Sequence, residues 1–131
     1  MTTLQRLQER RADFRQALQR LREAMAVPED SIVRDAIIQR FEFTFELAWK
    51  MAQAWLALNA TADAKYPRAV WQAAFAAGLV TDGDGWSTML EMRNLTSHTY
   101  DEQHATKVVD YLRKKGLELF SELESRMKDS G

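Results

Sequence analysis

Apolar positions recur at intervals of three and four residues along most of the chain, and polar positions fill the gaps between them. This period is typical of amphipathic helices that bury one face. The pattern predicts helices over residues 3–26, 31–58 and 67–77, a fourth beginning near residue 84, and a last one beginning after residue 101. The expected fold is therefore all-α, an antiparallel up-and-down helical bundle of four long helices plus one short helix.

The stretch from Phe41 to Glu46 alternates apolar and polar residues, which is also the pattern of a β-strand. Its flanks keep a helical period, and no second strand is visible elsewhere to pair with it. We therefore predict a helix with a narrow polar stripe and a wide apolar surface, as expected of the central helix of the bundle. The stripe consists of Asp35, Gln39, Glu42, Glu46, Lys50 and Gln53.

Local signals mark the ends of the predicted helices. Pro67 suits the first position of the short helix, where a missing N–H costs nothing, and Gly78 suits a left-handed residue just after its end. Asp84 and Asp101 are placed to cap the fourth and the last helix. Residues 128–131 are expected to fray as a terminal tail.

Two arginines, Arg34 and Arg40, fall inside the apolar arc of the second helix. A charge at such a position must be paired or must line a polar groove, because its burial alone is costly. For Arg34 we expect a side chain that snorkels to water at the helix edge. For Arg40 a snorkelling side chain and a ligand-binding side chain are equal alternatives.

Length and composition limit the class of protein. The 131 residues suit a single domain spanning 1–131 with one hydrophobic core. The absence of cysteine excludes disulfides and thiolate metal sites, and it fits a reducing cytoplasm. No apolar stretch has the length of a membrane span, and the N-terminus lacks the apolar core of a signal peptide, so we expect a cytoplasmic protein without a membrane partner. The net charge of −1 provides no general attraction to nucleic acid.

The segment from Arg93 to Tyr100 carries the residues best suited to chemistry. Helix periodicity places Arg93 on an apolar stripe, facing the bundle or a groove, and places Asn94 four residues before His98, where the two side chains are neighbours. A histidine can transfer protons near neutral pH, and an arginine can bind a phosphate whose charge rises in the transition state. Together they suit metal-independent cleavage of RNA.

The same residues also fit a purely structural role, in which His98 bonds to Asn94 and packs beside Arg93. No phosphate-binding loop, serine nucleophile motif or metal-spaced histidine pair competes with the segment. The Asp-Gly turn at residues 81–85 lacks the later ligands of a calcium-binding loop. His104, the other histidine, is interpreted as incidental. We predict no metal site and no cofactor.

Two strings of the sequence resemble those of the nucleotidyltransferase substrate-binding protein family, a branch of the HEPN superfamily. The strings are Arg40-Phe41-Glu42-Phe43-Thr44-Phe45-Glu46-Leu47-Ala48-Trp49-Lys50 and Arg93-Asn94-Leu95-Thr96-Ser97-His98-Thr99-Tyr100. The similarity covers nearly the whole chain, including the helix start Tyr66-Pro67-Arg68 and the Asp-Gly turn before Trp86. HEPN proteins share an arginine, four to six intervening residues and a histidine; Arg93 and His98 match that spacing, and Asn94 stands at the favoured polar position after the arginine.

The resemblance implies a helical-bundle homodimer that assembles with a minimal nucleotidyltransferase encoded beside it. In several such pairs the HEPN member is an RNase toxin, and the nucleotidyltransferase neutralises it by adenylylating the tyrosine two residues past the histidine, here Tyr100. By this interpretation Arg93 stabilises the phosphorane, His98 is the general acid/base, Asn94 orients His98, and Tyr100 is the modified residue or a phosphate ligand. Two His98 side chains facing one groove of a dimer could act as base and acid.

HEPN domains also serve as non-catalytic partners, and the alternative is a substrate-binding subunit of a nucleotidyltransferase complex with an RNA or nucleotide ligand. The near-zero net charge favours this alternative, whereas the intact set of Arg93, Asn94 and His98 favours the ribonuclease. The four Trp, six Phe and six Met exceed the apolar bulk that one small bundle needs, which predicts an oligomer interface on part of a helix face.

Overall fold

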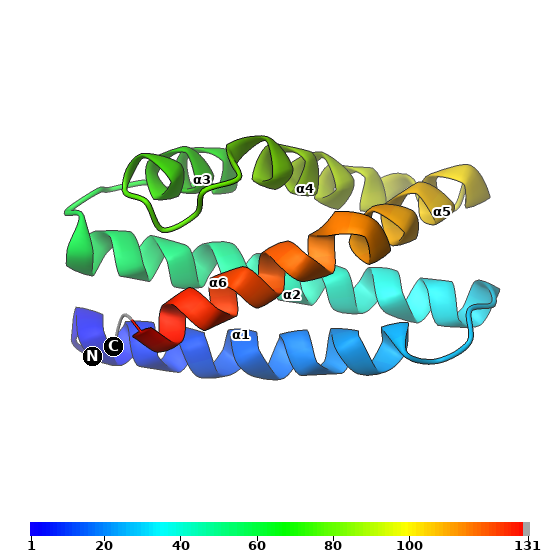
Figure 1. The fold of residues 1–131 in the computed structure, drawn as a ribbon, viewed down its shortest axis with the longest axis horizontal. Helices are drawn as coiled ribbons and strands as arrows, with labels where there is room; N and C mark the ends of the chain where they lie inside the picture. The colour runs from blue at the N-terminus through cyan, green and yellow to red at the C-terminus, as the bar shows by residue number, and fades with distance from the viewer. Residues whose placement is uncertain (130–131) are drawn as a thin grey trace.

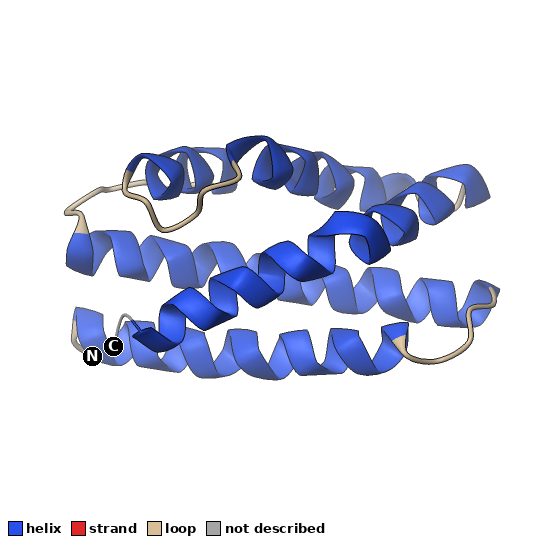
Figure 2. Ribbon diagram, in the orientation of Figure 1, coloured by secondary structure: helices blue, strands red, loops and turns tan. Residues whose placement is uncertain are grey.

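The computed structural model describes residues 1–129, and within them the chain forms helices joined by loops, with no strand (Figure 2). The predicted all-α bundle is confirmed. The elements are α1 (Thr3–Met25), α2 (Ser31–Asn59), α3 (Pro67–Ala76), α4 (Gly83–Leu95), the 3₁₀ turn η1 (Thr96–His98), α5 (Glu102–Tyr111), the π turn η2 (Leu112–Gly116) and α6 (Leu117–Asp129). Of the tail predicted to fray, Lys128 and Asp129 are instead the last residues of helix α6. Residues 130–131 lie outside the described residues.

Helices α1 and α2 run antiparallel and side by side along the length of the molecule (Figure 1). Helix α4 lies on the other side of α2, and α5 and α6 cross back over α2 and α1 toward the end where the N-terminus lies. The connection between α1 and α2 is short, which forces neighbouring antiparallel packing. Helix α2 contacts α1, α3, α4 and α5, as its wide apolar surface predicts.

The alternating stretch of α2 is helical, as predicted. Phe41 and Phe45 are buried on one face because residues four apart lie above one another on a helix. Phe43 lies between them in sequence but points to the opposite side, where it is exposed. A strand would have placed all three phenylalanines on the same face, so the helix explains both burials and the exposure.

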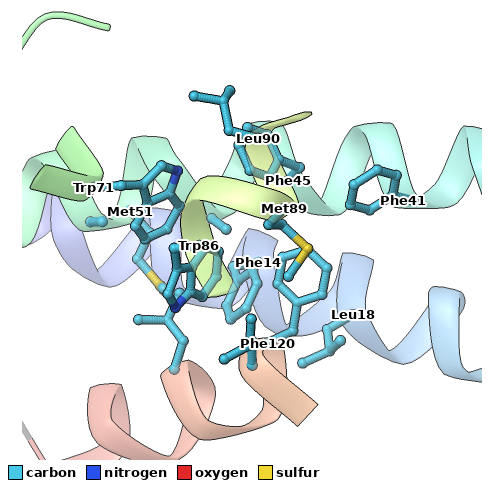
Figure 3. Packing of buried hydrophobic residues seen from close by; sticks show 14 of the residues in the cluster. Phe14, Leu18, Phe41, Phe45, Met51, Trp71, Trp86, Met89, Leu90 and Phe120 are labelled. Atoms are coloured by element: carbon cyan, nitrogen blue, oxygen red, sulfur yellow. The ribbon is translucent and has the colours of Figure 1, made fainter. Parts of the chain in front are cut away.

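A cluster of aromatic rings joins the helices at the centre of the bundle (Figure 3). The fully buried ring of Phe120 lies 6.1 Å from the ring centroid of Phe14, 6.2 Å from that of Phe41 and 5.7 Å from that of Trp86. Trp86 stacks on Trp71 with ring centroids 3.9 Å apart. Rings from α1, α2, α3, α4 and α6 therefore form one connected cluster. This cluster holds α4 against the rest of the bundle.

The helix ends follow the predicted local signals at most positions. Pro67 begins α3, Gly78 after that helix has φ of 79°, and Asp101 caps α5 by accepting from the Gln103 N–H at 2.9 Å. The prediction for α4 was wrong, because Asp82 and not Asp84 is its N-cap. The Asp82 carboxylate accepts from the Gly85 N–H at 2.9 Å and pairs with Lys115 at 3.0 Å.

The hydrogen bond from the Gly85 N–H, and then the nearby Lys115 ammonium, lower the pKa of Asp82, so the cap is anionic. Lys115 belongs to the π turn, which lies far along the chain from α4. Asp82 and Asp84 are both suited to cap α4 by residue type. The one that caps the helix, Asp82, is also the one that pairs with the distant Lys115.

The last predicted helix is interrupted by the π turn η2, at whose end the Leu117 N–H donates to the Leu112 carbonyl. A side-chain carbon added to Gly116 in this turn would lie 2.8 Å from Leu112 Cδ2 and 3.3 Å from Met89 Sδ. A larger residue would therefore have to displace the end of the Leu112 side chain and would press on Met89 of α4. Just before the turn, the Tyr111 hydroxyl donates to the Gly85 carbonyl at 2.8 Å, and burial raises the pKa of Tyr111 to about 12. The start of α4 is thereby tied to the end of α5.

No helix within residues 1–129 combines the length and the apolar character required to cross a membrane.

Candidate functional site

The segment that carries the predicted site begins where α4 changes into the 3₁₀ turn η1. Three hydroxyl groups each donate to the carbonyl three residues earlier: Thr96 to Arg93 at 2.6 Å, Ser97 to Asn94 at 2.9 Å, and Thr99 to Thr96 at 3.1 Å. Such bonds compete with the α-helical ladder and favour a tighter turn. The run of Thr and Ser residues therefore ends α4 immediately after Leu95.

Arg93 lies on the last turn of α4 and is held at two points. Its Nη1 donates to Thr96 Oγ1 at 3.0 Å and lies 3.6 Å from Glu42 Oε2 on α2. The side chain is 32% exposed. Arg93 thus lies at the edge of the α2/α4 contact, partly covered as its place on an apolar stripe predicted, and Thr96 and Glu42 hold its guanidinium there.

Thr96 and Glu42 were not among the residues singled out from the sequence. Thr96 is buried and lies three residues after Arg93, and residues three apart are neighbours on a helix surface. Glu42 was assigned to the narrow polar stripe of its helix. The spacing of Thr96 from Arg93 was a usable signal, whereas the contact with Glu42 depends on how α2 and α4 pack.

His98 ends η1, and its side chain is exposed. Its ring centroid lies 6.3 Å from that of Tyr100 and 6.5 Å from that of His104, with edge-to-face geometry in both cases. Tyr100 is 88% exposed. His104, interpreted as incidental from the sequence, therefore belongs to the same small group of rings as the two predicted site residues.

Asn94 is exposed, and within the described residues no hydrogen bond joins its side chain to the His98 ring. The reason is the turn: an α-helix places residues four apart about 40° from one another, whereas three 3₁₀ steps after Leu95 increase that separation to about 100°. The main-chain carbonyl of Asn94 accepts from Ser97 instead. The free protein therefore does not use Asn94 to orient His98.

Arg40 is not brought to this segment. It lies two residues before Glu42 and so on the far side of α2, where its Nη1 donates to the Arg20 carbonyl of α1 at 2.7 Å. There it lines a depression of about 430 Å³ that also includes the exposed ring of Phe43. The Arg40 side chain is therefore paired with the main chain of α1 and also lines a depression between α1 and α2.

Arg34 differs from the prediction of a snorkelling side chain, because it is half-buried and paired twice. It lies 3.1 Å from Glu29 and 3.1 Å from Glu102 at the start of α5. Glu29 also pairs with Arg113 of the π turn at 3.1 Å. Burial alone would raise the pKa of Glu29, but hydrogen bonds from Arg34 and Arg113 outweigh it and hold that pKa below its usual value. This network anchors the start of α5, directly after the loop that carries Tyr100.

The arrangement provides an exposed imidazole, a fixed guanidinium and an exposed phenol at one end of α4. These groups can transfer a proton and bind an anionic oxygen. Across the part of the chain that the structure describes, no group of three or more His, Asp or Glu side chains is placed to hold a metal ion.

The chain matches a family model described as nucleotidyltransferase substrate binding protein like, over residues 9–129. It is 38% identical over 88 residues to a Haemophilus influenzae protein named probable ribonuclease HepT, covering 61% of this chain. The chain spans 60% of the length of that relative.

Two solved structures resemble the fold. A crystal structure of a Thermus thermophilus protein matches with a TM-score of 0.81 and 31% identity, covering 88% of this chain and 98% of the other. A Haemophilus influenzae protein, described as having the fold of a substrate binding domain of a nucleotidyltransferase, matches with a TM-score of 0.64 and 26% identity, covering 93% and 96% of the two chains.

Proposed function

This chain belongs to the nucleotidyltransferase substrate-binding protein family, and from that membership we propose that it is a metal-independent endoribonuclease, the HEPN toxin of a pair with a minimal nucleotidyltransferase. The ribonuclease name of the Haemophilus influenzae relative supports this assignment. The proposed place of action is the cytoplasm, where RNA and the partner enzyme meet.

The observations that support the proposal most are the Arg93 guanidinium held on the last turn of α4 and the exposed imidazole of His98 at the end of η1. The Arg93 guanidinium is already held by Thr96 and Glu42, so little conformational entropy is lost when a phosphate binds. In the proposed mechanism His98 takes the proton of the 2′-hydroxyl as it attacks the adjacent phosphate. Arg93 stabilises the negative charge that grows on the phosphorane oxygens.

Completion of the reaction requires an acid that protonates the leaving 5′-oxygen. A homodimer with the two His98 side chains facing one groove would provide base and acid together. The exposure of His98 and Tyr100 in one protomer supports this part of the proposal, because a single protomer leaves the site open to solvent. Asn94, exposed on the same turn, is assigned to orient His98 once substrate or the second protomer is in place.

The ribonuclease proposal is tested with purified protein and RNA in EDTA. The wild-type protein is expected to cleave, and His98→Ala is expected to lower the rate by about 100- to 10,000-fold, the usual contribution of a general acid or base. Gln103→Ala is the matched control, because Gln103 is also exposed near this turn and its hydrogen bond to Asp101 uses only its main chain. A dimeric wild-type protein that leaves RNA intact would exclude the ribonuclease.

We further propose that the partner nucleotidyltransferase adenylylates Tyr100. The phenol is 88% exposed and its ring lies 6.3 Å from that of His98, so an attached adenylyl group would lie next to the His98 imidazole and obstruct its access to RNA. Mass spectrometry after co-expression with the partner is expected to find the added mass on the peptide that contains Tyr100. Tyr66 is the internal control, since it is 63% exposed but lies before α3. Modification of Tyr66 to the same extent, or none on Tyr100, would contradict the proposal.

A second candidate function is a non-catalytic subunit that holds substrate for the nucleotidyltransferase. Two observations favour it: the ion pair with Glu42 offsets the charge of Arg93, and the net charge of the chain is −1. Under this alternative the purified chain leaves RNA intact but lowers the KM of the nucleotidyltransferase. The same preparations therefore distinguish the two functions.

A further inference from the structure

His104 lies on the first turn of α5 and reaches back to the main chain of His98. Its Nδ1 is 3.2 Å from the His98 carbonyl oxygen and 3.9 Å from Asp101 Oδ2. The two imidazole centroids are 6.5 Å apart. Since a carbonyl oxygen can only accept, this contact is a hydrogen bond in the tautomer whose Nδ1 carries a proton.

The His98 carbonyl accepts from two donors, because the main-chain N–H of Asp101 also lies 3.2 Å from it. Within the described residues, the bond from His104 is the one hydrogen bond that joins a side chain of α5 to the main chain of η1. It connects the anchored helix α5 to the residue that the proposed reaction uses. Tyr100, between His98 and Asp101 in the sequence, is 88% exposed and contributes little to holding this loop.

We propose that His104 is a positioning residue, which fixes the main chain of His98 through its Nδ1–H and so sets where the His98 imidazole meets the substrate. The inference rests on the proposed function, because it gives His104 a part in the same reaction. Its physical basis is that a displacement of about 1 Å at a reacting group can reduce a rate by about 100-fold. If His104 were a surface residue without this role, its substitution would leave the position of the His98 imidazole unchanged.

Three substitutions separate the possible roles of His104. The amide nitrogen of His104→Asn occupies the place of Nδ1 and keeps the donor, whereas that of His104→Gln occupies the place of Nε2 and loses it; His104→Ala removes both. If His104 positions His98, His104→Asn keeps a kcat near wild type, while His104→Gln and His104→Ala lower kcat at least tenfold, a loss of about 1.4 kcal/mol, with KM nearly unchanged. Equal loss in all three variants would make His104 an acid or base in its own right and overturn the proposal, as would equal activity in all three.

A readout that does not need RNA keeps this test separate from the ribonuclease proposal. The chain has two histidines, so each His104 variant leaves a single imidazole signal in the NMR spectrum, that of His98. We expect His104→Asn to keep the chemical shift of that signal and the slow exchange of the Asp101 amide, and His104→Gln and His104→Ala to shift the first and accelerate the second. Identical spectra and exchange rates in all three variants would overturn the positioning role even if RNA is cleaved. If the wild-type protein does not cleave RNA but the three variants differ in this way, the ribonuclease proposal is overturned and the contact between His104 and His98 is established.

Discussion

Arg93→Ala is expected to slow RNA cleavage by about 100- to 1,000-fold, the usual loss when one donor to a developing oxyanion is removed. The guanidinium presents a planar set of donors that matches two phosphate oxygens at once. Its ion pair with Glu42 at 3.6 Å is longer than a charge-assisted hydrogen bond, so a phosphate can compete for the same nitrogen. Most of the loss should appear in kcat, because the charge on the phosphate oxygens is greatest in the transition state.

Arg22→Ala is the matched control for this substitution. Arg22 is also 32% exposed, donates to a hydroxyl, that of Ser121 at 2.9 Å, and pairs with a glutamate, Glu124 at 3.3 Å. The two variants lose the same kinds of contact, and each is expected to lower the free energy of unfolding by about 1 kcal/mol or less, as is usual for exposed pairs.

Steady-state cleavage rates and urea unfolding, measured on both variants, separate catalysis from stability. Arg93→Lys keeps the charge but not the fork of donors, and its rate is expected to lie between those of the wild type and Arg93→Ala. An Arg93→Ala protein that cleaves RNA at the wild-type rate would show that the guanidinium does not stabilise the transition state. Equal loss of activity in Arg22→Ala would show that the effect is not local to the site.

Phe120→Ala is expected to lower the free energy of unfolding by about 3 to 5 kcal/mol, the range for a large aromatic removed from a core. The ring is fully buried and lies against Phe14, Phe41 and Trp86, which belong to three other helices. Its removal leaves a cavity that these rings cannot fill without moving helices, because the core is close-packed. A loss of this size is a large part of the total stability of a small domain.

Urea unfolding followed by tryptophan fluorescence measures the effect, since Trp86 contacts the substituted ring. Phe75→Ala is the control, because Phe75 is 53% exposed on α3 and its removal should cost well under the core value. Similar small losses in both variants would mean that the aromatic cluster does not stabilise the bundle. A large loss in Phe75→Ala alone would place the important contact on α3.

The core contact and the site are connected through α4. At its start, Asp82 pairs with Lys115 of η2 and the Gly85 carbonyl accepts from Tyr111 of α5, so this end is held by those two elements. At its other end Arg93 is held by Thr96 and Glu42. Because a helix is stiff, contacts at both ends determine where its last turn lies. Destabilising the core should also lower activity, because the unfolded fraction of the chains has no site.

The helices, the buried faces and most of the helix ends could be predicted from the sequence because their causes are local. The period of three and four residues identified α2 despite the alternation of Phe41, Phe43 and Phe45. Pro67 and Gly78 were placed correctly because each restricts or permits backbone angles at its own position. The resemblance to the family was carried by short strings such as Arg93 to Tyr100, which require no knowledge of distant contacts.

The tertiary structure decided what lies beside those strings. Asp82 and not Asp84 caps α4, and Lys115 from a distant turn pairs with that cap. Glu42 reaches Arg93 only because α2 and α4 pack together, and His104 reaches the His98 carbonyl only because the chain tightens into a 3₁₀ turn and reverses before α5. The periodicity of a sequence determines which face of each helix is buried. It does not determine which residues of two helices come into contact, because that depends on how the helices pack.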